Sequence, residues 1–187
     1  FSRVTKPLNL FGVNLKSKNG TLPIEVKGTK LLKPINYYEE KGSAQVKTCI
    51  ILSAINSPGI TRIKAKKSRN HTELLLKYLK YPIKIKESRK YDQIYIKGLN
   101  QIKSFEYKVP GDISSASFFI ILTLLSKNSS LIIKNININQ SRSGILKILY
   151  KMKAKIRILN KKNYRGEYIG DIKIKSTKNL KSINCPE

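Results

Sequence analysis

Cysteine, histidine and tryptophan are scarce in this sequence. Its 187 residues include two cysteines, one histidine and no tryptophan. Cys49 stands in an apolar run and Cys185 near the end of the chain, and no pair of cysteines or histidines has the spacing of metal ligands. The sequence therefore indicates neither a disulfide framework nor a metal site, and we expect reduced thiols in a cytoplasmic protein.

Long apolar runs and glycine-rich nucleotide-binding motifs are absent as well. No segment reaches the ~18 uninterrupted apolar residues of a membrane span, and no signal peptide opens the chain. Walker, dinucleotide-binding and nucleophile-elbow motifs are all missing. The 40% hydrophobic content still suffices for one domain of ordinary size or two small ones. Because the chain begins at Phe1 and not at methionine, we expect a piece of a longer protein.

Acidic residues are few, with 11 against 38 lysines and arginines, which gives a formal net charge of +27. Such a charge often marks nucleic-acid binding, because a basic surface releases the counterions of phosphates. Only seven of the cations are arginines, however, and arginine makes the commonest base-specific contacts. The lysines are spread along the chain among isoleucine and asparagine, as AT-rich coding would produce. We therefore expect no nucleic acid and no membrane as partner, with a mild attraction for small anions.

The chain contains an internal repeat of helical and strand patterns. Ile50–Ala54 and Ile120–Leu124 are apolar runs of helical character, and each precedes a run with the alternation of a β-strand. Ser68-Arg69 and Ser141-Arg142 then each open a second helical pattern, with apolar residues spaced i, i+3, i+4. Two further strand patterns close each unit. The repeated order is therefore helix, strand, helix, strand, strand.

A short run with strand character precedes the first helix of each unit, at residues 22–26 and 105–109. With these runs the pattern predicts a βαβαββ unit of roughly 70 residues that occurs about twice. The predicted fold class is therefore α/β. We place the boundary near Ser104, between a unit at residues 1–104 and a unit at residues 105–187.

The first predicted helix begins with the polar segment Gly42-Ser43-Ala44-Gln45. Ser43 suits an N-cap, because its hydroxyl can accept a hydrogen bond from a free backbone N–H. Capping explains Ser43 but not Gln45, whose amide would point beyond the helix end. A helix N-terminus presents free N–H groups and a partial positive charge, which suit a phosphate or a carboxylate. A structural cap and an anion site are therefore both open interpretations of this segment.

The first helix of the second unit begins with the same type of signal, and there capping alone is the favoured interpretation. Pro110-Gly111 ends a strand pattern, and Asp112 or Ser114 can cap the helix that follows. From Phe118 to Leu125 the sequence is apolar on every side of the helix except at Thr123. We therefore expect other elements to surround this helix.

The segment Ser68-Arg69-Asn70-His71-Thr72-Glu73 precedes the second helix of the first unit. Its structural interpretation is a capping box or a salt bridge, with Glu73 favoured by the helix dipole. Its functional interpretation makes Arg69 a bidentate clamp for a phosphate or a carboxylate. His71, the only histidine, could act as an acid or a base, but the sequence offers it no partner.

In their order along the chain, these motifs resemble the 5-enolpyruvylshikimate-3-phosphate (EPSP) synthase family. Each motif would be weak alone, but together they cover nearly the whole chain. The resemblance rests on the segments Gly42–Lys47, Pro58–Thr61, Ser68–Glu73, Val109–Ala116 and Arg142–Leu146.

The resemblance implies an inside-out α/β barrel of βαβαββ units, of which this chain would hold about two of six. The first unit would be the last unit of one domain, and the second would be the first unit of the other domain. The implied activity is transfer of the enolpyruvyl group from phosphoenolpyruvate to the 5-hydroxyl of shikimate 3-phosphate, with release of phosphate. This transferase reaction belongs to the shikimate pathway to chorismate and aromatic amino acids. No cofactor is implied, and the full-length protein would be a cytoplasmic monomer.

The resemblance also implies four substrate-binding residues. Ser43 and Arg69 would contact the phosphate of shikimate 3-phosphate, Gln45 would reach across both substrates, and Ala44 would contribute its backbone. The family's general base and most of its phosphoenolpyruvate site would lie outside this chain, so we expect no catalytic residue within it and an inactive fragment. The alternatives are the sister transferase that acts on UDP-N-acetylglucosamine and a lysine-rich nucleic-acid-binding protein.

Overall fold

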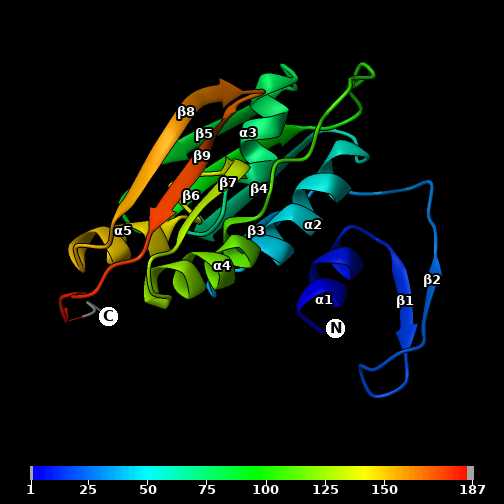
Figure 1. The fold of residues 1–187 in the computed structure, drawn as a ribbon. Helices are drawn as coiled ribbons and strands as arrows, with labels where there is room; N and C mark the ends of the chain where they lie inside the picture. Colours follow the sequence, from blue (N-terminus) through cyan, green and yellow to red (C-terminus); the bar gives the residue numbers. More distant parts are fainter. Residues whose placement is uncertain (1, 185–187) are drawn as a thin grey trace. The chain divides into compact units, whose positions relative to one another are not determined.

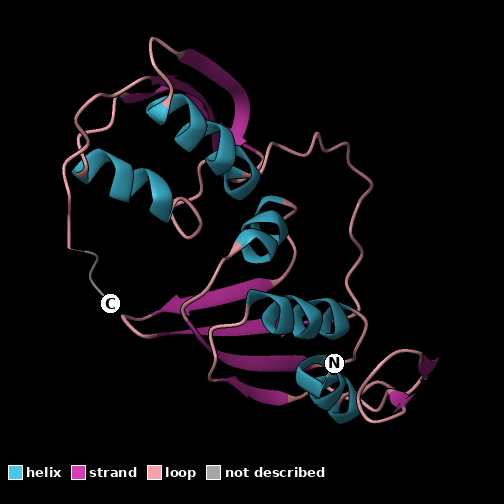
Figure 2. Ribbon diagram, turned by 60° about the horizontal axis from the view of Figure 1, so that its bottom comes forward, coloured by secondary structure: helices cyan, strands magenta, loops and turns pink. Residues whose placement is uncertain are grey.

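The computed structural model describes residues 2–184, which divide into two compact units after Ser104 (Figure 1). In each unit a β-sheet carries helices on one face (Figure 2). Cys49 is a free thiol, whereas Cys185 lies outside the described residues. None of the described helices has the length and apolar character needed to cross a bilayer.

The first unit combines a four-stranded sheet with a smaller pair of strands. β3, β4, β6 and β5 are neighbours in that order; β3 and β4 run parallel, and the other neighbours run antiparallel. β1 and β2 form a separate antiparallel pair. In chain order the elements are α1 (Ser2–Leu10), β1 (Asn14–Ser17), β2 (Ile24–Lys27), β3 (Asn36–Glu39), α2 (Ala44–Ile55), β4 (Ile60–Lys66), α3 (His71–Tyr78), β5 (Ile83–Glu87) and β6 (Tyr91–Lys97).

The core of the first unit lies between this sheet and the helices α2 and α3. β4 alternates between exposed and buried residues, because successive side chains of a strand point to opposite faces. Ile63 on β4 and Ile94 on β6 are buried in the same core cluster as Ile50 and Ile51 of α2. Each isoleucine removed from water contributes about 2 kcal/mol. This packing holds α2 and α3 on the sheet, and the N-terminal ends of both helices carry the predicted site.

The second unit has a three-stranded antiparallel sheet in the order β7, β9, β8. Asp112 is the N-cap of its first helix, which confirms one of the two predicted caps. Ile120, Ile172 and Ile174 have no exposed surface and form the centre of a core of its own. In chain order the elements are α4 (Ile113–Leu125), β7 (Ser130–Asn137), α5 (Gly144–Lys151), β8 (Ile156–Tyr164) and β9 (Glu167–Lys175).

The predicted α/β class is confirmed, with two corrections to the strands. β3, α2, β4, α3, β5 and β6 give the βαβαββ order, but its first strand is Asn36–Glu39; the predicted run at residues 22–26 overlaps β2, which pairs with β1 outside the main sheet. The second unit gives α4, β7, α5, β8 and β9, and the predicted strand at residues 105–109 was wrong. That segment has no ladder partner among the described residues, and its Val109 is 80% exposed.

The expectation that other elements surround α4 was also wrong for the described chain. Ala116, Ile120 and Leu124 on one face are buried, whereas Phe118 is 77% exposed and Leu122 is 63% exposed. A helix on a single sheet buries only the stripe that meets the sheet. The all-round apolar sequence of α4 therefore leaves an exposed apolar face in this chain.

Candidate functional site

The first turn of α2 is capped as the sequence predicted. Ser43 has an extended backbone conformation, and its Oγ accepts a hydrogen bond of 3.3 Å from the backbone N–H of Val46. Gly42 before it has φ +68°, and a Cβ there would stand 3.1 Å from the carbonyl oxygen of Lys67. Glycine therefore lets this turn pack against the segment that leads to Arg69.

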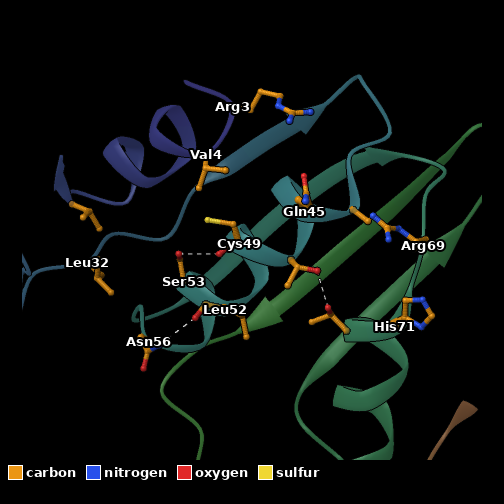
Figure 3. A pocket seen from close by; sticks show the side chains of 14 residues that line it. Arg3, Val4, Leu32, Gln45, Cys49, Leu52, Ser53, Asn56, Arg69 and His71 are labelled. Carbon is orange, nitrogen blue, oxygen red and sulfur yellow. Dashed lines mark hydrogen bonds between the residues drawn. The ribbon is translucent and has the colours of Figure 1, made fainter. Parts of the chain in front are cut away.

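An open hollow of about 1130 Å³ lies at this helix start and brings together three of the four predicted site residues. Ala44 and Gln45 border it from the first turn of α2, and Arg69 borders it from the loop before α3. Figure 3 shows Gln45 and Arg69 at this hollow. Ser43 does not line this hollow. It lines a neighbouring one of about 160 Å³, and Arg3 of α1 borders both.

The electrostatics of the larger hollow favour an anion. The backbone N–H groups of Ala44 and Gln45 have no acceptor within an α-helix, and the helix start carries a partial positive charge. Arg3 and Arg69 add two guanidinium groups. None of the described residues that line the hollow is acidic. A phosphate or a carboxylate in this position would meet several donors and no repelling carboxylate.

Two adjacent contacts join α2 to α3 beside the hollow, and one of them is made by Thr48 and Thr72, which line it. Lys47 Nζ lies 2.6 Å from Glu73 Oε1, and both side chains are almost fully buried. The hydroxyls of Thr48 and Thr72 form a hydrogen bond of 2.7 Å. Of the two structural interpretations of Glu73, the salt bridge is the one observed. These contacts hold the start of α3 against α2. They therefore help to fix the distance between Gln45 on α2 and Arg69 before α3.

Three further side chains near the hollow have recognisable chemistry. Burial raises the pKa of the Cys49 thiol, partly offset by a hydrogen bond from Ser53, so Cys49 stays protonated at neutral pH and is a poor nucleophile. His71 lines the hollow at the first position of α3. Ser68 precedes Arg69 but does not line the hollow, and its Oγ is buried without a hydrogen-bond partner among the described residues.

Sequence patterns missed Lys47 and the contribution of Arg3. Lys47 lies in a helix with buried Val46, Ile50 and Ile51, and a lysine in such a stripe is a signal for a buried partner. The first acidic residue that fits is Glu73 on the next helix, so the pair could have been proposed from the sequence. Arg3 offered no such signal, because its place depends on how α1 packs against α2.

Comparisons with known proteins identify the family of the chain. Residues 1–185 match the sequence family described as EPSP synthase (3-phosphoshikimate 1-carboxyvinyltransferase). Among curated relatives named 3-phosphoshikimate 1-carboxyvinyltransferase, the protein of Petrotoga mobilis is 43% identical over 185 residues, which are 97% of this chain and 42% of the relative. The protein of Caldicellulosiruptor bescii is 42% identical over 186 residues, with the same two shares.

Solved structures give the same result. EPSP synthase from Acinetobacter baumannii matches 99% of this chain and 41% of its own chain, with a TM-score of 0.82 and 32% identity. The enolpyruvyl transferase NikO from Streptomyces tendae has a TM-score of 0.63 over 95% of this chain and 42% of its own, but at 11% identity it supports only the fold. The chain thus spans about two-fifths of the length of these relatives. On the family match and these identities, the chain belongs to the EPSP synthase (3-phosphoshikimate 1-carboxyvinyltransferase) family.

Proposed function

We propose that this chain supplies part of the substrate site of an enzyme that transfers the enolpyruvyl group of phosphoenolpyruvate to the 5-hydroxyl of shikimate 3-phosphate. The observation that carries the proposal is that Gln45, in the first turn of α2, and Arg69 line the same hollow. No acidic residue is among the described residues that line it. Family membership supports the choice of substrates.

Each of the four residues has a role in this proposal. Arg69 and the Ser43 hydroxyl bind the phosphate of shikimate 3-phosphate, and the backbone N–H of Ala44 adds a donor from the helix start. The Gln45 amide reaches across both substrates. Because both substrates are anions, the site must offset their mutual repulsion while the acceptor hydroxyl adds to the double bond and phosphate is then eliminated. The helix dipole and the guanidinium groups perform that task.

We further propose the larger arrangement that family membership suggests. Residues 1–104 would form the last unit of one domain, and residues 105–187 the first unit of the other. The full-length protein would act in the cytoplasm as a monomer, without a nucleic-acid or membrane partner. The chain alone would give no turnover, because the general base that the family uses would come from outside it.

Calorimetric titration of the chain with shikimate 3-phosphate tests the proposed site. Arg69→Gln and Gln45→Ala should each weaken binding at least about tenfold, since a charge-assisted hydrogen bond contributes about 1.5–3 kcal/mol. Lys97→Gln is the matched control, because it removes one cation from an exposed position on β6 and should leave affinity unchanged.

Two results would contradict the proposal. One is binding of UDP-N-acetylglucosamine in place of shikimate 3-phosphate, which would favour the sister transferase. The other is an equal loss of affinity in Lys97→Gln and Arg69→Gln, which would show that net charge, and not the site at α2, attracts the ligand.

A further inference from the structure

The second unit repeats the helix start that forms the proposed site, but with one change in charge. In both units a glycine precedes the N-cap of the first helix: Gly42 before Ser43, and Gly111 before Asp112. In both units a Ser-Arg pair precedes the second helix, and the arginine lies two residues before the first helical residue. Arg69 thus stands before α3 as Arg142 stands before α5. The N-cap is neutral in the first unit and acidic in the second.

In the second unit the acidic N-cap occupies the donors of its own helix start. Asp112 Oδ1 accepts hydrogen bonds of 2.9 Å from Arg142 Nε and 3.2 Å from the backbone N–H of Ser114. Its Oδ2 accepts a 3.3 Å hydrogen bond from the Ser115 hydroxyl. The Arg142 guanidinium, foremost, lowers the pKa of Asp112 to about 2, so the carboxylate is ionised at neutral pH. An internal anion therefore sits between the arginine and the helix N-terminus.

In the first unit the corresponding donors have no such internal partner. Ser43 is uncharged and engages only the N–H of Val46 through its side chain among the described residues. No ion pair of Arg69 occurs in the described part of the chain, and its guanidinium borders an open hollow without acidic lining. The close approach of Gly42 to the Lys67 carbonyl places the N-cap next to the segment that carries Arg69.

We infer that the charge of the N-cap residue decides whether such a helix start accepts an external anion, and that neutral Ser43 keeps Arg69 open to a phosphate ligand. The second unit shows the closed alternative, in which a carboxylate of the chain takes the place of the ligand. Ser43 is then a specificity determinant for a phosphate-bearing ligand, beyond the hydrogen bond that its hydroxyl would donate to that ligand. The inference rests on the proposed function.

The variants Ser43→Asp and Ser43→Asn test the charge directly. Both side chains have nearly the same shape and are good N-caps, so α2 should stay folded in both. In titrations with shikimate 3-phosphate, Ser43→Asp should bind at least about tenfold more weakly than Ser43→Asn, because its carboxylate repels the phosphate and occupies Arg69. Equal affinity of the two variants would overturn the inference.

A ligand-free measurement separates occupation of Arg69 from simple repulsion. Thermal unfolding should show a higher midpoint for Ser43→Asp than for Ser43→Asn at pH 7, and the difference should shrink to the part contributed by the helix dipole when Arg69→Gln is added to both. A difference that is equally large with and without Arg69 would overturn the inference while leaving the proposed function standing. A wild-type chain that binds no shikimate 3-phosphate would overturn both.

Discussion

At the scale of single residues, the buried ion pair of Lys47 and Glu73 is sensitive to substitution, because removing one partner leaves the other charge buried alone. Glu73→Gln should lower the free energy of unfolding by about 3 kcal/mol, because it leaves the Lys47 ammonium buried without a counter-charge. The double variant Lys47→Met/Glu73→Leu should recover most of that loss, since it removes both buried charges. Urea unfolding measures both changes. A double variant as unstable as Glu73→Gln would contradict the ion pair as the cause.

The ion pair of Asp112 and Arg142 predicts a dependence of stability on pH. The pKa of Asp112 is lowered from 3.8 to about 2 in the folded chain, foremost by the hydrogen bond from Arg142. A group whose pKa is lowered by folding stabilises the fold above its unfolded pKa, and the contribution is lost as the pH falls toward the folded pKa. The stabilisation is therefore present above about pH 4 and declines between pH 4 and pH 2.

Thermal unfolding of the wild type and Asp112→Asn at pH 7 and pH 3 checks this dependence. Asparagine keeps the N-cap, so the variant removes only the charge. The Asp112 side chain is 42% exposed, so solvent screening limits the difference at pH 7 to about 1 kcal/mol or less. The difference should be smaller at pH 3. An equal difference at both pH values would contradict the assigned cause.

Residue patterns in the sequence predicted the polar start of α2, but they did not predict the contacts between α2 and α3. Ser43 and Asp112 were recognised because capping is local and depends on a few neighbouring residues. Gln45 was singled out because capping did not explain it, and Arg69 because a guanidinium suits a phosphate or a carboxylate. The structure brings both to one hollow. Lys47 was not recognised, although a lysine in an apolar helical stripe is a signal for a buried partner.

At the scale of elements, Gly98 after β6 lies close against the end of α2 and the residues that follow it. A Cβ at Gly98 would stand 1.8 Å from the carbonyl oxygen of Ser57 and 2.3 Å from that of Ala54. Gly98→Ala should therefore destabilise the first unit by about 3 kcal/mol or more. Gly144→Ala is the control, because a Cβ there meets no atom within 4 Å and alanine favours the first turn of α5. Chemical denaturation distinguishes the two, and equal stabilities would refute the packing described.

The elements with a regular pattern were predicted, and the irregular ones were not. β4 and β6 alternate apolar and polar residues, and both pair in the main sheet. β3 was missed because its Asn-Tyr-Tyr-Glu sequence has no alternation of apolar residues, and it joins the sheet by parallel pairing to β4. The run at residues 105–109 alternates as a strand would, but a strand also needs a partner, which sequence periodicity does not reveal.

At the scale of the whole molecule, the two units have separate hydrophobic cores. Ile50 belongs to one core and Ile172 to the other, and both are fully buried. Replacing either by alanine should cost about 2–5 kcal/mol in its own unit. Amide hydrogen exchange should show faster exchange in the first unit for Ile50→Ala and in the second for Ile172→Ala. Loss of protection in both units from either change would contradict independent cores.

The proposed function requires that the first turn of α2 and Arg69 bind one phosphate-bearing ligand together. An NMR titration of the chain with shikimate 3-phosphate tests it most directly, because each backbone and side-chain N–H reports its own surroundings. We predict that the N–H signals of Ala44, Gln45 and the Arg69 side chain shift together with one dissociation constant, while those of Asp112 and Arg142 do not move. Shifts spread over the lysines of both units, without saturation at α2, would contradict it.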